Sequence, residues 1–301
     1  MIAGVIGCGR MGENHVRVYS QLRGIDDVLV YDVDSSRCSL MKSRYGAVPI
    51  ASLHDLLQTA NLVSICVPTS SHLDAVRVAV DEYVPFLVEK PISGSLDDAY
   101  TLESLCCPVG SGVGHIERFN SLPNMIVDWI KDPRYISIRR HNPGSIRVVD
   151  TDVVDDLMIH DIDLVRHLFF DRCPDSVVSV VNDSVAHALL KFGDCVVSLS
   201  SSRVSDEKVR DIRIECDTYT VVGDFITQEF VVYRKPGGSS FSGDLYWQTQ
   251  TVERFVAPRV EPLQAELAEF IRCVREKDAF PVSIEEAVEN METAERIKSG
   301  G

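Results

Sequence analysis

The chain has 301 residues, of which 45% are hydrophobic and 25% charged. This is the composition of an ordinary globular protein, and the length is typical of two domains. The net charge of −15 at pH 7 argues against nucleic acid as a partner, because its phosphates require a basic surface. No run approaches the roughly 20 apolar residues of a membrane span, so we expect no membrane partner.

The nine cysteines are scattered through the chain, and no C-x-x-C spacing occurs among them. Neither a disulfide framework nor a zinc site is therefore predicted. The first predicted strand begins at the second residue, with no basic and apolar leader before it. These features together favour a cytoplasmic protein with reduced thiols.

The opening of the chain is typical of a dinucleotide-binding turn. An apolar strand over residues 2–6 runs into the spacing G-x-G-x-x-G, formed by Gly7, Gly9 and Gly12, and a helical pattern follows. In such a turn the first glycine permits the tight bend, the second lets a pyrophosphate approach the backbone, and the third lets the helix pack against the strand. The helix N-terminus then presents free N–H groups to the phosphates.

The second predicted strand, residues 28–31, ends at Asp32. An acid at this position holds the ribose hydroxyls of the adenosine half of the cofactor. Asp32 would repel a 2′-phosphate, so we expect NAD to be preferred over NADP. Ser35 and Arg37 lie near enough to weaken this preference. A glycine-rich turn without a ligand is the alternative that the spacing leaves open.

Strand and helix patterns alternate up to about residue 118. Gly46 is expected to end one helix, and Ser95 to cap the start of another. The run Leu62–Val67 is continuously apolar, as a buried parallel strand should be. We predict a Rossmann domain over residues 1–118, with a doubly wound parallel sheet.

From residue 119 to residue 301 the pattern changes. A helix (122–130), a strand (135–140) and a helix (156–170) precede a series of strand-like runs between about residues 176 and 256. Two amphipathic helices end the chain, opened by Pro262 and by the capping box Ser283/Glu286. We predict a substrate-binding domain on an open, mostly antiparallel sheet. The predicted helices are enough to cover one face of this sheet, and the apolar residues of its other face predict a homodimer or homotetramer.

The helix over residues 156–170 is mostly apolar but carries a narrow titratable stripe. At about 100° per residue, Asp156, His160, Asp163 and His167 fall within roughly 60° of one another. Such a helix should line a cleft, where Asp156 orients the imidazole of His160 and His160 accepts a proton. An exposed edge with i,i+4 pairs and a metal site are the alternatives. No third ligand with metal-site spacing stands out, and no metal is predicted.

Two further groups of cations are candidates. Lys90 ends a predicted parallel strand next to the cofactor cleft; the alternative is an ordinary surface lysine. Arg139, Arg140 and Arg147 precede the Asp156 helix, and arginine forks suit the oxygens of a diphosphate. The alternative is that Arg139 and Arg140 alternate on a strand, one facing solvent and one pairing with a carboxylate.

Together, Gly7–Gly12, Asp32, Glu89-Lys90-Pro91 and the spacing Asp156-x-x-x-His160 resemble the Gfo/Idh/MocA oxidoreductases. These are NAD(P)-dependent dehydrogenases of sugars and related polyols, with a Rossmann domain and an open-sheet C-terminal domain. The segments 113–120, 139–140, 156–163 and 261–270 resemble the UDP-N-acetylglucosamine 3-dehydrogenase branch of that family.

The resemblance implies roles for individual residues. Lys90 and His160 would form the acid/base pair around the oxidised hydroxyl, and Asp156 would support them. The implied cofactor contacts are Gly7, Gly9, Arg10, Met11, Gly12, Asp32, Thr69, His72, Glu89 and Lys90. The implied substrate contacts are His115, Glu117, Arg118, Asn120 and Asp163, together with the three arginines. Asn120 is followed by Ser-Leu-Pro where relatives commonly have proline directly, so the entry into the next helix is expected to differ.

We therefore predict a dehydrogenase that oxidises the 3-hydroxyl of a UDP-N-acetylglucosamine-like sugar with NAD. His160 would take the hydroxyl proton while Lys90 polarises the oxygen. A dehydrogenase of a free sugar or inositol is the nearest alternative. A non-catalytic NAD-dependent sensor or scaffold is an alternative of another class, and the joint presence of Lys90, Asp156 and His160 argues against it.

Overall fold

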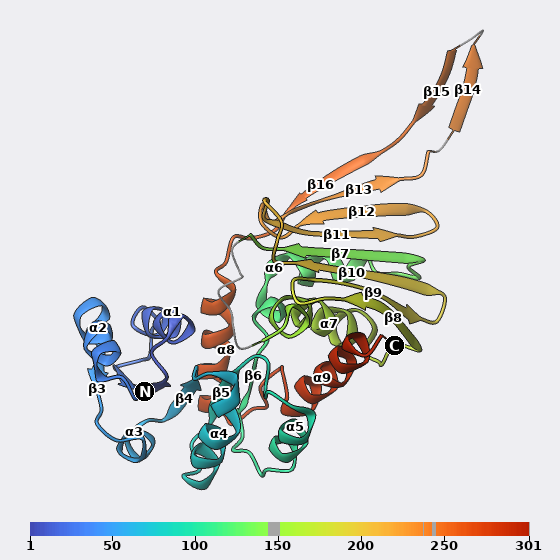
Figure 1. The fold of residues 1–301 in the computed structure, drawn as a ribbon. Coiled ribbons are helices and arrows are strands. Elements are labelled where there is room, and N and C mark those ends of the chain that lie inside the picture. Colours follow the sequence, from blue (N-terminus) through green and yellow to red (C-terminus); the bar gives the residue numbers. More distant parts are fainter. Residues whose placement is uncertain (144–150, 237, 243–244, 301) are drawn as a thin grey trace. The chain divides into compact units, whose positions relative to one another are not determined.

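The computed structural model describes residues 1–300 except 144–150, 237 and 243–244 (Figure 1). The chain forms two compact units, one of Met1–Phe119 with Glu261–Glu292 and one of Asn120–Val260 with the residues from Thr293 onward. Residues 261–292, which the division by sequence places in the second domain, thus cluster with the first 119 residues. Among the described residues, no helix has the length and apolar character needed to cross a membrane.

A six-stranded parallel sheet is the centre of the first unit, in the order β3-β2-β1-β4-β5-β6 (Figure 1). The inner strands β1, β4 and β5 are buried along almost their whole length, as parallel strands covered on both faces should be. The predicted Rossmann sheet is confirmed. Its strands are β1 (Ile2–Ile6), β2 (Asp27–Tyr31), β3 (Val48–Pro49), β4 (Leu62–Ile65), β5 (Phe86–Glu89) and β6 (Gly112–Gly114).

The helices of this unit start and stop at the residue types that the sequence indicates. Gly46 ends α2 in the left-handed region, at a φ of 75°. The Ser95 hydroxyl accepts the N–H of Asp98 at the start of α5, and Ser283 and Glu286 form the expected capping box before α9. The helices are α1 (Arg10–Tyr19), α2 (Ser35–Tyr45), α3 (Leu53–Thr59), η1 (Thr69–Ser71), α4 (His72–Asp81), α5 (Leu96–Glu103), η2 (Ile116–Phe119), α8 (Pro262–Glu276) and the first part of α9 (Ile284–Lys298), whose residues from Thr293 onward belong to the second unit.

Helix α8 belongs to the first unit because its apolar face completes that unit's core. Leu263, Leu267 and Phe270 recur at helical spacing and are all buried. They join the same hydrophobic cluster as the side chains of β1, β4 and β5, and α8 packs against α1. The amphipathic pattern thus indicates which face of α8 is buried, whereas the fold decides which sheet it covers.

The second unit is built on an eight-stranded sheet in the order β16-β13-β12-β11-β7-β10-β9-β8 (Figure 1). Only β7 and β10 are parallel neighbours in it, so the predicted open, mostly antiparallel sheet is confirmed. Its strands are β7 (Tyr135–His141), β8 (Ser176–Val181), β9 (Val185–Phe192), β10 (Cys195–Ser202), β11 (Val209–Glu215), β12 (Tyr219–Asp224), β13 (Glu229–Arg234) and β16 (Val252–Val256).

Among the described residues, β14 (Gly238–Ser242) and β15 (Leu245–Thr249) form a separate two-stranded antiparallel sheet that the sequence pattern did not indicate. The helical segments of the unit are α6 (Ser121–Ile126), η3 (Val127–Trp129), η5 (Val154–Met158), α7 (Ile159–Asp163) and η6 (Leu164–Phe170). The helix expected over residues 122–130 is therefore α6 followed by a short 3₁₀ turn.

The face of the large sheet that points away from the core carries apolar side chains. On β8, the side chains of Val178 and Val180 are 62% and 80% exposed. Val177 points to the opposite face of the sheet and is buried. On β16, Val252 and Val256 are 53% and 59% exposed. This is the face at which the sequence predicts contact between copies of the chain, and assembly through it stays a prediction.

The close approach of β6 to the segment after α8 allows a first test. A Cβ added at Gly112 would lie 2.3 Å from Phe280 Cδ1 and 2.6 Å from the Val282 carbonyl oxygen. We expect Gly112→Ala to lower the free energy of unfolding by about 1–3 kcal/mol, because the backbone would have to shift. Chemical denaturation measures this. In Gly94→Ala, where a Cβ meets nothing within 4 Å, the change should stay within about 0.5 kcal/mol. Equal stabilities would contradict the packing of residues 279–282 against β6.

Candidate active site

The strand order of the first unit reverses between β1 and β4, which are parallel neighbours. At such a switch point the loops at the carboxyl ends of the two strands diverge to opposite faces and leave room for a ligand. Gly7 after β1 and Cys66 after β4 meet here, since a Cβ at Gly7 would lie 2.7 Å from the Cys66 carbonyl oxygen. The glycine turn predicted from the sequence therefore lies at the switch point.

The three glycines of this turn differ in their surroundings. Gly7 has a φ of 91°, which favours glycine, and Gly12 lies so close to β1 that a Cβ there would be 1.8 Å from the Gly7 carbonyl oxygen. A Cβ on Gly9 would meet no atom of the described residues within 4 Å. Gly9 is also the residue that precedes α1. The open space above Gly9, at the N-terminus of a helix, fits the pyrophosphate of a dinucleotide.

Asp32 ties the end of β2 to this turn. Its Oδ2 accepts the N–H of Cys8 at 2.7 Å, and its Oδ1 accepts the N–H of Asp34 at 2.8 Å. Arg37 Nη1 lies 3.8 Å from the same carboxylate. The carboxylate is thus held in place by main-chain donors, beside a cation that would also lie near a bound ribose. Arg10 and Met11 open α1, and Thr69 opens η1 after β4.

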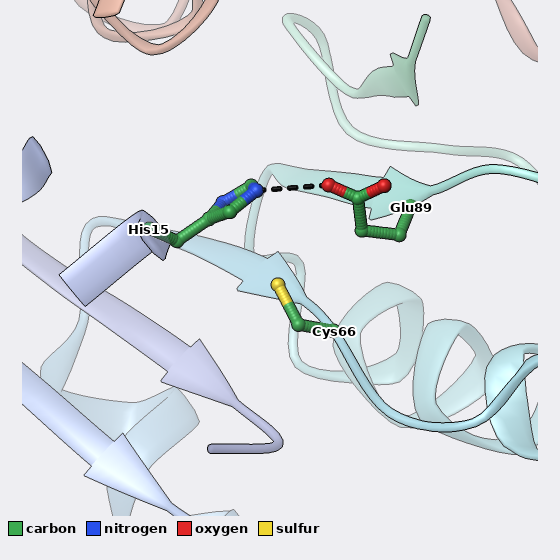
Figure 2. Close-up of side chains that lie close together, drawn as sticks. All are labelled: His15, Cys66 and Glu89. Carbon is green, nitrogen blue, oxygen red and sulfur yellow. Dashed lines mark hydrogen bonds and ion pairs between the residues drawn. The ribbon is translucent and has the colours of Figure 1, made fainter. Parts of the chain in front are cut away.

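A buried cluster lies at the ends of β4 and β5 (Figure 2). His15 of α1 donates through Nε2 to Glu89 Oε1 at 2.9 Å, and Cys66 Sγ lies within 4.8 Å of both ligand atoms. Burial raises the pKa of Glu89, but the hydrogen bond from His15 and the positive charge of Lys90 more than offset it. The pKa of Glu89 therefore lies below its ordinary value, while burial raises that of the Cys66 thiol well above it.

His15 and Cys66 were not selected from the sequence. His15 sits among apolar residues on a predicted helix, and a single histidine there gives no local signal of its partner. Lys90 follows Glu89 directly and is half-buried. The residue types of the cluster are those that also bind metals. In this structure His15 is hydrogen-bonded directly to Glu89, and burial favours the protonated form of the Cys66 thiol.

His72, expected to contact the cofactor, is buried and faces main-chain carbonyls. Its Nδ1 lies 3.0 Å from the Pro91 oxygen and 3.3 Å from that of Ile92, and its Nε2 lies 3.1 Å from that of Val67. Burial lowers the pKa of His72, against these hydrogen bonds. The imidazole joins the loop after β4 to the loop after β5, and a cofactor contact from it stays a prediction.

The segment His115–Asn120, expected at the substrate, follows β6. His115 and Glu117 are buried, and Arg118 pairs with Glu286 at 3.5 Å. Asn120 caps α6, because its Oδ1 accepts the N–H of Leu122 at 3.1 Å. The cap explains how the chain enters this helix with Ser121 and Leu122 ahead of the proline. Substrate contacts from these residues stay predictions.

In the second unit the helix that carries Asp156, His160 and Asp163 is not a regular α-helix. The turns η5 and η6 on either side of α7 are π-helical. Hydrogen bonds to the fifth residue widen these turns, so the expected spacing of about 100° per residue does not hold there. Asp163 is completely buried, whereas Asp156 and His160 are partly exposed. The stripe therefore does not present all of its members to one open face.

Arg203 at the end of β10 holds the start of this helix. Its Nη2 donates to Asp156 Oδ2 at 3.1 Å and to the carbonyls of Thr151 and Asp152 at 2.9 and 2.8 Å. The Arg203 side chain is 7% exposed. The partner of Asp156 thus lies 47 residues away in sequence, and the i,i+4 pattern gave no indication of it.

The two neighbouring arginines of β7 form the alternating arrangement considered above. Arg140 points to the helix side of the sheet, where it pairs with Asp161 at 2.7 Å; the two side chains are 2% and 0% exposed. Arg139 pairs with Asp211 on the opposite face. Arg140 is buried and its guanidinium is paired with Asp161, so the structure gives no support to the prediction that Arg140 binds a phosphate. Arg147 lies outside the described residues.

Comparisons with known proteins agree with this geometry. The model of the oxidoreductase family with an NAD-binding Rossmann fold, Gfo/Idh/MocA, matches residues 1–110. The chain is 31% identical over 253 residues to the UDP-N-acetylglucosamine 3-dehydrogenase of Acidithiobacillus ferrooxidans, covering 79% of each chain. The solved structure of that enzyme matches with a TM-score of 0.86 at 25% identity, over 100% of this chain and 97% of the other.

An inositol 2-dehydrogenase of Pseudarthrobacter chlorophenolicus is 25% identical over 54% of this chain and 52% of its own length. The glycine turn and the acid after β2 lie where a dinucleotide-binding Rossmann fold places them. The chain therefore belongs to the Gfo/Idh/MocA family and is an NAD(P)-dependent oxidoreductase that acts on CH–OH groups.

Proposed function

We propose that the chain is an NAD-dependent sugar-nucleotide dehydrogenase that oxidises the 3-hydroxyl of a UDP-N-acetylglucosamine-like sugar to the 3-keto sugar. The observation that carries this proposal is the identity to a UDP-N-acetylglucosamine 3-dehydrogenase over most of both chains. A dehydrogenase of inositol or a free sugar is the second candidate, favoured by inositol relatives that match about half of their length.

The residues at the switch point would hold the cofactor. The open backbone at Gly9 and the N-terminus of α1 suit the pyrophosphate, and Asp32 suits the adenosine ribose. When bound, NAD supplies the acceptor for the hydride. The chain's own part is to orient the sugar and to handle the proton of its hydroxyl.

Two side chains are proposed for that proton chemistry. His160 removes the hydroxyl proton, and its partly buried position limits exchange with water. Lys90 donates to the same oxygen and stabilises the negative charge that develops on it. Asp156, fixed by Arg203, supports His160 or binds a sugar hydroxyl.

Cofactor preference follows from Asp32. We expect NAD to bind more tightly than NADP, because the buried carboxylate would repel a 2′-phosphate. Asp32→Ser should lower the ratio of the dissociation constant for NADP to that for NAD by roughly tenfold, or about 1.4 kcal/mol. Asp27→Ser, at the other end of β2, is the control and should leave the ratio unchanged. Titration calorimetry gives both constants, and tighter NADP binding by the unmodified chain would refute the preference.

The proposed proton acceptor gives a second test. His160→Ala should lower kcat by about two to four orders of magnitude, the usual effect of losing a positioned base. Its affinity for NAD should hardly change, and Lys90→Ala should also lower kcat. His167→Ala, on the same helix, removes an imidazole without an assigned role and should retain turnover. Stopped-flow measurement of NADH formation compares them, and a fully active His160→Ala enzyme would make the histidine structural.

Substrate size separates the two candidate functions. The kcat/KM for UDP-N-acetylglucosamine should exceed that for N-acetylglucosamine or inositol by at least about 100-fold, since contacts to the nucleotide add binding energy to the transition state. UDP alone should then inhibit competitively. Initial rates of NADH formation with each compound decide this. Equal rates on the free and the UDP-linked sugar would refute the proposal that the substrate is a sugar nucleotide. A preference for inositol would favour the second candidate.

A further inference from the structure

The segment that carries Lys90 is anchored on both sides by buried histidines. His15 of α1 donates to Glu89, which precedes Lys90, at 2.9 Å. His72 of α4 reaches the carbonyls of Pro91 and Ile92, which follow it. The side chain of Glu89 before Lys90 and the backbone after Lys90 are thus each tied to a different helix. One of these, α1, is the helix that begins at the glycine turn.

The carboxylate of Glu89 depends on His15. It is 9% exposed, and in the part of the chain that the structure describes His15 provides its one hydrogen bond. Gly114 of β6 lies opposite Glu89, and as a glycine it has no side chain that could donate a hydrogen bond to the carboxylate. A Cβ added at Gly114 would lie 3.5 Å from Glu89 Oε1. A buried carboxylate without a donor is costly and takes up a proton instead. Removing the donor should therefore neutralise Glu89.

His15 fits the role of a neutral donor. Nε2 faces the carboxylate, so it carries the proton. Nδ1 is buried and has no hydrogen-bond partner among the described residues, so a second proton would place an unpaired N–H in the core. The pair then keeps a net negative charge, and Glu89 interacts electrostatically with Lys90.

We propose that His15 is a positioning residue for the reaction: by holding Glu89 ionised and aligned, it keeps Lys90 charged and in place. This rests on the proposed role of Lys90 in the oxidation. His15 also joins the helix at the pyrophosphate turn to the strand end that carries the lysine. It touches neither the sugar nor the reacting atoms, and it acts through Glu89.

The direct test follows the amine of Lys90 and needs no substrate. Full-length protein, with and without NAD, is treated with an acetyl N-hydroxysuccinimide ester, and acetylation is followed by peptide mass spectrometry. In His15→Leu, Lys90 should be acetylated several-fold faster, because a neutral Glu89 no longer stabilises the ammonium form. Lys42, exposed on α2, is the internal reference. His15→Gln, which keeps an N–H donor, should restore the slow rate.

A matched control comes from the surface of the same unit. His54 Nδ1 lies 2.9 Å from Glu82 Oε1, but the His54 side chain is 56% exposed. His54→Leu breaks a pair of the same length in water and should change neither the labelling of Lys90 nor turnover. If His15→Leu fails to fold, Glu89→Gln replaces it, since the amide still accepts from His15 but carries no charge. Fast labelling is expected there as well.

Kinetics supply the second readout. With whichever substrate the unmodified chain oxidises, His15→Leu should lower kcat by roughly 100-fold, while the dissociation constant for NAD stays within about threefold. Unchanged labelling of Lys90 in both His15→Leu and Glu89→Gln would overturn the inference, as would a His15→Gln protein that behaves like His15→Leu. A Zn²⁺-dependent rise in melting temperature that requires His15 would identify a metal site instead. Failure to oxidise UDP-N-acetylglucosamine would refute the proposed function alone.

Discussion

The close approach of α1 to β1 at Gly12 is the constraint on which the first unit depends. No side chain fits there, because a Cβ would meet the Gly7 carbonyl oxygen at 1.8 Å. The approach sets the direction of α1, and with it two consequences for the site. The helix N-terminus lies beside the open backbone at Gly9, and His15, one turn further along, reaches Glu89 on β5. The glycine turn and the segment that carries Lys90 are therefore joined through α1.

Both units bury charged side chains, and pairing makes this tolerable. Arg140 and Asp161 form a bidentate pair in the second unit, and Glu89 receives a hydrogen bond from His15 in the first. Burying such groups costs several kcal/mol per ion, which only good geometry offsets. The two pairs nevertheless have different consequences. The Arg140–Asp161 pair joins β7 to α7 and is buried, whereas the Glu89 pair adjoins a lysine with a proposed chemical role.

The sequence by itself determined the Rossmann sheet, the glycine turn, the acid after β2 and the helix caps at Gly46, Ser95 and Ser283. These features are local: the spacing of a few residues decides the turn or the cap, and continuous apolar runs decide the buried strands. The open, mostly antiparallel second sheet was also predictable, because its strands follow one another with short turns. The titratable residues on the 156–170 helix were identified, but their distribution was not, since the π-helical turns depart from the 3.6-residue period.

Only the tertiary structure decided which partners those residues meet. His15 and Glu89 are 74 residues apart, and Arg203 and Asp156 are 47 apart. Periodicity indicates which face of an element is buried, but not what it is buried against. For the same reason the apolar face of α8 predicted a covered helix, while its place on the first unit required the assembled core. Arg139 and Arg140 show the limit most directly: adjacent in sequence, they lie on opposite faces of β7, because strand alternation and distant carboxylates decide where each guanidinium goes.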